Sequence, residues 1–129
     1  MLTDWMQTLS NELQLNPPLK EESQGHYLLP IGEEHTIHVW EKEEGYSLMC
    51  DIAPLPQGGQ EELLTHLMHG NLLGQGTYGN TLAFRTEEKM VCVECRDLYS
   101  TEYEEFKNRV EDFINCIDYW HAEIQNHQK

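Results

Sequence analysis

The sequence is poor in basic residues. Eight lysines and arginines stand against 23 aspartates and glutamates, which gives a formal net charge of −15 at pH 7. A surface this negative repels phosphate groups and anionic lipids at short range. Nucleic acids and membrane surfaces are therefore poor candidates for direct partners. The charge itself has two interpretations, simple solubility or a soluble carrier for an aggregation-prone client, and composition does not separate them.

Long apolar runs are also missing. No segment approaches the ~20 consecutive apolar residues that a membrane-spanning helix needs. Residues 1–4 contain no basic stretch followed by an apolar run, so we expect no secretory signal. We therefore expect a cytoplasmic protein without membrane insertion, whose four cysteines are reduced.

The first half of the sequence predicts one helix followed by three strands. Apolar residues recur at spacings of three and four over residues 1–15, which predicts a helix with one apolar face, and Pro17 and Pro18 end it. Residues 19–24 are polar and are expected to form a loop. Alternating apolar residues predict strands over residues 26–31, 35–41 and 45–53. Because Pro30 lacks a backbone donor, the first of these strands is expected at a sheet edge.

The second half predicts a helix, two strands and a long helix. Leucines crowd residues 60–72, which predicts the second helix, and a glycine-rich turn follows it. Strands are predicted over residues 80–86 and 89–97. Between 103 and 125, apolar residues recur every three or four positions; a core helix covering the sheet is favoured over a coiled coil. The chain is therefore expected to be a single α+β domain, residues 1–129, of order α-β-β-β-α-β-β-α, with a mostly antiparallel twisted sheet packed against helices.

Cys92 and Cys95 form a C-x-x-C pair, but the chain has no second pair at the spacing of a zinc site. The pair lies inside a predicted strand, where residues three apart point to opposite faces, so the two sulfurs cannot share a ligand. A redox-active pair would instead stand at a helix N-terminus. We therefore expect structural cysteines and no functional metal.

Other residue patterns fall short of catalytic motifs. His66 and His69 share a helix face but lack the glutamate and the spacing of a zinc-protease helix. Gly74, Gly76 and Gly79 have the spacing of a dinucleotide-binding loop, yet they follow a helix and precede a strand, which reverses the required order. His35 and His38 lie on opposite faces of a predicted strand and do not converge, and the remaining histidines, His26, His121 and His127, are scattered along the chain. No nucleophile or acid–base pair stands out, so we expect no enzymatic activity and no cofactor.

The middle of the chain resembles a known family. Residues 64–84, LTHLMHGNLLGQGTYGNTLAF, combine a leucine-rich helix, an Asn-Leu-Leu helix end, a glycine-rich turn and the start of a strand. This combination resembles the Tir/CesT family of class I type III secretion chaperones. The resemblance implies a homodimer in the bacterial cytoplasm that binds the N-terminal segment of a secreted effector or secretion-control protein and keeps it soluble and competent for secretion. It also implies the secretion ATPase as a further partner.

The resemblance implies two binding surfaces. In the family, clients occupy apolar pockets between the first helix and the early strands, and dimers form through the second helix and nearby strands. Carried onto this chain, the groove candidates are Leu9, Leu13, Leu15, Leu28, Leu29, Ile31, Ile37 and Val39. Trp40 lies on the opposite strand face and is a candidate exposed anchor. The dimer candidates are Leu67, Met68, Leu72, Leu73 and Tyr78. Because aliphatic residues are most often buried, each groove candidate has a place in the core as its alternative.

Two alternative functions remain compatible with the sequence. The same fold could serve as a regulatory protein that binds a transcription or secretion-control protein without escorting it. The chain could also be one subunit of a heterodimeric chaperone. The identity of the partner, established by co-purification from the host, would separate these hypotheses.

Overall fold

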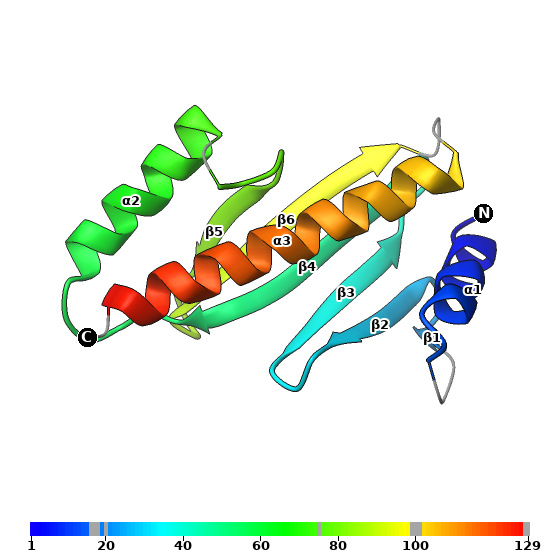
Figure 1. Ribbon diagram of the computed structural model, residues 1–129, viewed down its shortest axis with the longest axis horizontal. Helices are drawn as coiled ribbons and strands as arrows, with labels where there is room; N and C mark the ends of the chain where they lie inside the picture. Colours follow the sequence, from blue (N-terminus) through cyan, green and yellow to red (C-terminus); the bar gives the residue numbers. More distant parts are fainter. Residues whose placement is uncertain (16–18, 20, 75, 99–101, 128–129) are drawn as a thin grey trace.

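The computed structural model describes residues 1–15, 19, 21–74, 76–98 and 102–127, which form three helices and a six-stranded sheet (Figure 1). The elements, in chain order, are α1 (Leu2–Glu12), β1 (Glu21–Ser23), β2 (His26–Ile31), β3 (His35–Glu41), β4 (Gly45–Pro54), α2 (Gln60–Leu73), β5 (Thr81–Arg85), β6 (Met90–Leu98) and α3 (Tyr103–His127). The strands lie in the order β1-β2-β3-β4-β6-β5, and all neighbouring strands are antiparallel. The α+β prediction is confirmed.

Helix α3 crosses one face of the sheet and forms the core with it (Figure 1). Six apolar residues along one side of α3 are at most 3% exposed: Phe106, Val110, Phe113, Ile117, Trp120 and Ile124. Alternate residues of the central strands join them in the same buried cluster: Ile37, Val39, Leu48, Cys50, Val91 and Val93. The intervening residues of β6 point to the other face, where Glu94 and Arg96 are exposed. The repeat of three and four therefore belongs to a core helix, as predicted, and not to a coiled coil.

One strand of the N-terminal half was not predicted. Residues 21–23, expected in a loop, form β1, which pairs with His26 and Tyr27 of β2. All three β1 residues are exposed and polar, so no apolar alternation indicates this strand. The rest of β2, residues 28–31, has no second partner among the described strands and keeps the edge position that Pro30 predicts. Pro17 and Pro18, predicted to end the first helix, lie outside the described residues.

Helix α1 is anchored on the N-terminal end of α3. The Trp5 ring lies 5.1 Å from that of Phe106 and 6.1 Å from that of Tyr46, measured between centroids. At the other end of α1, Glu12 accepts a hydrogen bond of 3.0 Å from the hydroxyl of Tyr103 and pairs with the ammonium of Lys107 at 3.0 Å. These contacts fix the position of α1 beside β2.

Helix α2 lies at the opposite end of the molecule, next to β5 (Figure 1). The side-chain amide of Asn71 makes two hydrogen bonds to Leu82 of β5: it donates to the carbonyl at 2.8 Å and accepts from the N–H at 2.7 Å. The amide therefore acts as a short piece of strand on the outer edge of β5. His66 also pairs with Glu123 of α3 at 3.1 Å, which ties α2 to the core helix.

The glycine-rich turn after α2 rests on α3. The indole of Trp120 donates a hydrogen bond of 3.0 Å to the carbonyl of Gly76. Gly74, Gly76 and Gly79 all have positive φ angles, between 71° and 82°, which other residues rarely adopt. The glycines therefore serve backbone geometry, as their place between a helix and a strand predicts.

Candidate functional site

A groove of about 280 Å³ lies between α1 and the first strands, where the sequence placed the client site. Its lining mixes apolar and polar side chains: Thr3, Met6, Gln7, Ser10, Asn11, Leu19, Glu21 and Tyr27. One end is closed by a hydrogen bond of 2.6 Å between the hydroxyls of Thr3 and Tyr27. Burial raises the pKa of the Tyr27 phenol, so this hydroxyl stays protonated at neutral pH. The groove can therefore hold apolar side chains and also offers neutral hydrogen-bonding groups to a peptide backbone.

The groove residues named from the sequence divide into two groups. Four of them are at most 3% exposed and belong to the core, so they cannot touch a client: Leu9, Leu29, Ile37 and Val39. For these four, burial favours the alternative of a place in the core, since all belong to the buried cluster that α3 forms with the sheet. The others keep accessible surface: Leu13, Leu15, Leu28, Ile31 and Trp40. Spacing identified the helix and strands correctly but could not say how deeply α3 covers them.

The polar lining of the groove was missed by the sequence analysis. Gln7 and Asn11 lie four apart on α1, and Glu21 belongs to the unpredicted β1. Their only signal in the sequence is that they flank the apolar stripe of the first helix. Polar residues in a groove have the same spacing as polar residues on an ordinary solvent-exposed helix face, so the sequence alone does not distinguish the two.

The edge of β2 adjoins this groove. Beyond Tyr27 no described strand pairs with the outer side of β2, so residues 28–31 present alternate backbone groups to solvent. Leu28 is half-buried on the face opposite α3, while Ile31 lies on the α3 side. An extended peptide can pair with such an edge and place alternate side chains into neighbouring pockets.

Trp40 lies on the open face of the sheet within a stack of rings. Its ring centroid is 4.7 Å from that of His26 and 5.3 Å from that of His38, and the planes are nearly parallel. The two imidazoles share a hydrogen bond of 3.0 Å, and burial together with the neighbouring His26 lowers the pKa of His38. Trp40 also lines a hollow of about 250 Å³ on this face. It is therefore a fixed, half-buried platform and not a freely exposed anchor.

A second apolar surface lies on α2 and the turn that follows it. Met68, Leu72, Leu73 and Tyr78 are 69%, 82%, 70% and 45% exposed. Leu67, named with them from the sequence, is 5% exposed and packs into the core. Leu67 and Leu63 lie on the buried side of α2, so burial favours a core position for Leu67 over a dimer contact. The four exposed residues form an apolar patch of the kind that marks an interface.

The cysteines lie in settings that suppress thiol chemistry. All four are buried, and burial raises the pKa of Cys50 to about 12 and that of Cys116 to about 11. Cys92 stands opposite Asp51 and Cys95 opposite Leu48, so the two cysteines lie on opposite faces of the sheet. Reactive and metal-binding cysteines need a lowered pKa and access to solvent. The C-x-x-C pair is therefore structural.

No helix within the described residues is both long and apolar enough to cross a membrane. The sequence profile of the Tir chaperone protein (CesT) family matches residues 5–121. A Chlamydia pneumoniae protein described as CPj0713/CpB0740 is 26% identical over 126 residues, which cover 96% of each chain.

Solved structures of the same fold include the ExsC–ExsE complex, with a TM-score of 0.74 and 15% identity over 95% of this chain and 92% of that chain. The Yersinia pestis type III secretion chaperone SycH, in complex with a fragment of YscM2, gives a TM-score of 0.68 and 13% identity over 91% of this chain and 97% of that chain. At these identities the likeness establishes the fold. The family match extends over most of the sequence and both of the apolar surfaces, so this chain belongs to the Tir chaperone protein (CesT) family and is a non-enzymatic type III secretion chaperone.

Proposed function

We propose that this chaperone acts in the bacterial cytoplasm as a homodimer in which each subunit holds an extended N-terminal segment of a secreted effector or secretion-control protein. The open edge of β2 beside the α1 groove carries the proposal. The groove accepts side chains, while the edge accepts the backbone of an extended segment. On this proposal the loaded dimer then passes its client to the secretion ATPase.

The similar structures support the choice of partner. ExsC was solved with ExsE, and SycH was solved with a stable fragment of YscM2. Binding would keep the client segment from forming a compact core, which a translocated protein has to avoid before export. The net charge of −15 keeps the loaded complex soluble.

The patch on α2 supports the homodimer. Leu72 and Leu73 are both at least 70% exposed, and burying a leucine side chain contributes roughly 1.5–3 kcal/mol. In a two-fold interface every residue contributes twice, so these two leucines supply roughly 6–12 kcal/mol before the cost of association is subtracted. Met68 and Tyr78, also exposed, would add to the buried apolar surface of such a dimer. The α1 groove lies at the other end of the molecule and stays accessible in such a dimer (Figure 1).

The same substitution at the two ends tests both parts of the proposal. Leu13 is 50% exposed and Leu72 is 82% exposed, so neither Leu13→Glu nor Leu72→Glu removes a core side chain. Leu13 follows Ser10 of the groove lining by three residues, so Leu13→Glu adds a charge at the end of α1 next to that lining. Desolvation of this charge by a bound client should cost about 2 kcal/mol of client affinity, or roughly 30-fold. Leu72→Glu should dissociate the dimer and leave the affinity of a subunit for a short client peptide unchanged. Each variant is the charge-matched control for the other.

The measurements are titration calorimetry with the N-terminal segment of a co-purified client and light scattering coupled to size exclusion. A dimer has twice the 15.1 kDa of one chain. If folded Leu13→Glu protein binds the segment as tightly as the parent, the groove proposal is wrong. A partner that stays bound after its N-terminal segment is deleted would instead indicate the regulatory alternative. A wild-type monomer at micromolar concentration would refute the homodimer and favour the heterodimer.

A further inference from the structure

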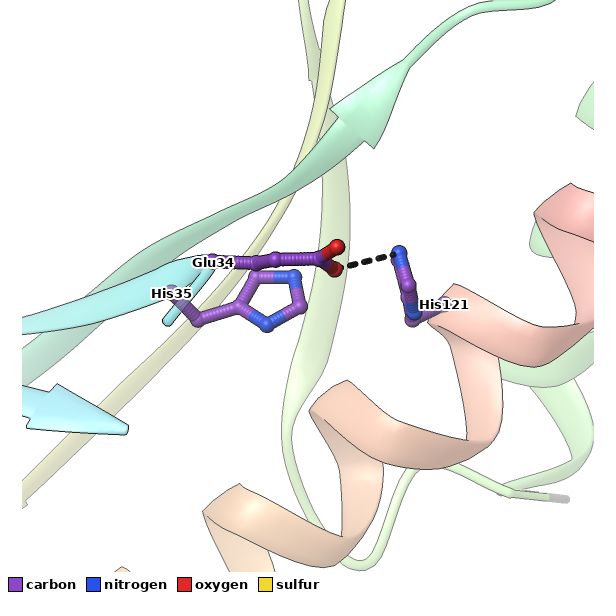
Figure 2. Close-up of side chains that lie close together, drawn as sticks. All are labelled: Glu34, His35 and His121. Carbon is purple, nitrogen blue, oxygen red and sulfur yellow. Dashed lines mark ion pairs between the residues drawn. The ribbon is translucent and has the colours of Figure 1, made fainter. Parts of the chain in front are cut away.

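Three potential metal ligands meet between the β2–β3 turn and the C-terminal half of α3 (Figure 2). Glu34 precedes β3, His35 begins it, and His121 lies on α3. One ligand atom from each lies within 4.8 Å of the other two, and an oxygen of Glu34 is 3.4 Å from Nε2 of His121. Glu34 and His35 are neighbours in the sequence, whereas His121 is distant and is brought to them by the fold.

The spacing suits a transition metal ion. Two ligands at ~2.1 Å from a tetrahedral zinc ion lie about 3.4 Å apart. The Glu34–His121 distance of 3.4 Å already has this value, and the exposed Glu34 side chain can adjust by rotation. The imidazole rings of His35 and His121 meet edge to face, with centroids 4.9 Å apart. Two imidazoles and one carboxylate form a set that zinc, cobalt and nickel prefer, whereas magnesium and calcium prefer oxygen ligands.

The surroundings hold the cluster in place and favour a cation. A bulge in β4 between Asp51 and Ala53 takes Ile52 out of the regular pairing with β6. The carbonyl of Ile52 accepts a hydrogen bond of 2.9 Å from Nε2 of His35, which keeps the ring beside Glu34. The hollow at the cluster has a volume of about 360 Å³ and is also lined by Glu33 and Asp118. These carboxylates add negative potential, and Asp118 or water can complete the coordination.

We propose that Glu34, His35 and His121 form a binding site for one divalent transition metal ion of the zinc type, which fastens the β2–β3 turn to α3. This departs from the expectation of no functional metal, which rested on the C-x-x-C pair and on motif spacing along the sequence. The site involves neither Cys92 nor Cys95, and it is independent of the proposed client groove.

Cobalt(II) is the probe, since its visible absorption reports both stoichiometry and ligand type. We expect one cobalt ion per chain, displaced by zinc, with the intense visible bands of four-coordinate geometry and without thiolate charge-transfer bands. His121→Asn and His35→Asn should weaken binding at least 100-fold, and Glu34→Gln about 10-fold. His69→Asn should bind normally, because His69 is exposed on α2, outside the cluster. Zinc should also raise the melting temperature of the wild type and of His69→Asn, but not that of His121→Asn.

Circular dichroism establishes that each variant is folded before titration. Absence of saturable binding by the wild type at tens of micromolar cobalt would overturn the proposal. So would binding that persists in His121→Asn, that disappears in His69→Asn, or that shows thiolate bands. Equal binding of magnesium would also refute it, because oxygen ligands alone would then account for the site.

Discussion

Replacing Gly76 by alanine should destabilise the fold through two separate terms. Gly76 has a φ of +76°, and a left-handed backbone conformation costs a residue with a Cβ roughly 1–2 kcal/mol. An added Cβ would also stand 2.5 Å, 2.8 Å and 3.0 Å from three ring carbons of Tyr119. Overpacking of this kind costs about 1–3 kcal/mol, because the ring must move. Moving Tyr119 also disturbs the hydrogen bond from Trp120 to the Gly76 carbonyl.

Gly74 supplies the matched control. Its φ of +71° imposes nearly the same backbone strain, but a Cβ there would have no neighbour within 4 Å. Gly74→Ala should therefore cost roughly 1–2 kcal/mol and Gly76→Ala roughly 2–5 kcal/mol. At about 3 °C per kcal/mol for a domain of this size, the melting temperatures should fall by about 3–6 °C and 6–15 °C. Urea denaturation gives the same free energies independently.

A double-mutant cycle isolates the ring contact. In a Tyr119→Ala background the clash is gone, so Gly76→Ala should cost no more than Gly74→Ala. The reasoning fails if Gly76→Ala is no more costly than Gly74→Ala in the wild type. It also fails if the cost of Gly76→Ala is the same with and without the Tyr119 ring.

Two further predictions concern charge and thiols. Hydrogen bonds from Lys107 and then Tyr103 lower the pKa of Glu12, so its contribution to stability is present above its unfolded pKa and is lost as the pH falls through the folded pKa. The melting temperature of the wild type should therefore exceed that of Glu12→Gln at pH 7, and the difference should shrink as the pH falls below the unfolded pKa of about 4.3; a constant difference would refute the linkage. Because all four thiols are buried, native protein should not react with a thiol reagent at pH 8, whereas unfolded protein should titrate four groups; rapid reaction of the native state would contradict the buried positions.

The repeating apolar patterns that extend over a whole helix or strand predicted the fold well. The repeat from Tyr103 to Ile124 located α3 and its buried face, because a helix that covers a sheet must present one continuous apolar stripe. Alternation located β3, β4 and β6 within one or two residues. The polar strand β1 was missed, since three exposed residues that pair only through their backbone leave no trace in side-chain pattern.

The exposure of the residues proposed for the binding surfaces was harder to predict than the fold. Leu9 and Leu13 lie on the same stripe of α1, yet Leu9 is 3% exposed and Leu13 is 50% exposed. Leu9 belongs to the buried cluster, whereas Leu13 is the C-cap residue and lies beyond the last residue of α1. His35 and His121 were also treated as unrelated, because their approach depends on how the β2–β3 turn lies against α3. Depth of burial and convergence of distant residues are properties of packing and carry no local signal.

The Asn71 side chain occupies the backbone groups of Leu82 on the outer edge of β5, so a further strand cannot pair there. With Leu82 occupied by this amide, strand addition at β5 is obstructed, and among the described strands the open edge at the other end of the sheet consists of β1 and residues 28–31 of β2. A dimer built through α2 would then have one unpaired sheet edge at each of its two ends. Dimers without client could associate through these edges into linear oligomers. A client segment paired with β2 would occupy this edge and so prevent the association of further dimers. Light scattering from concentrated chaperone should therefore decrease when client is added, although the total mass in solution has risen.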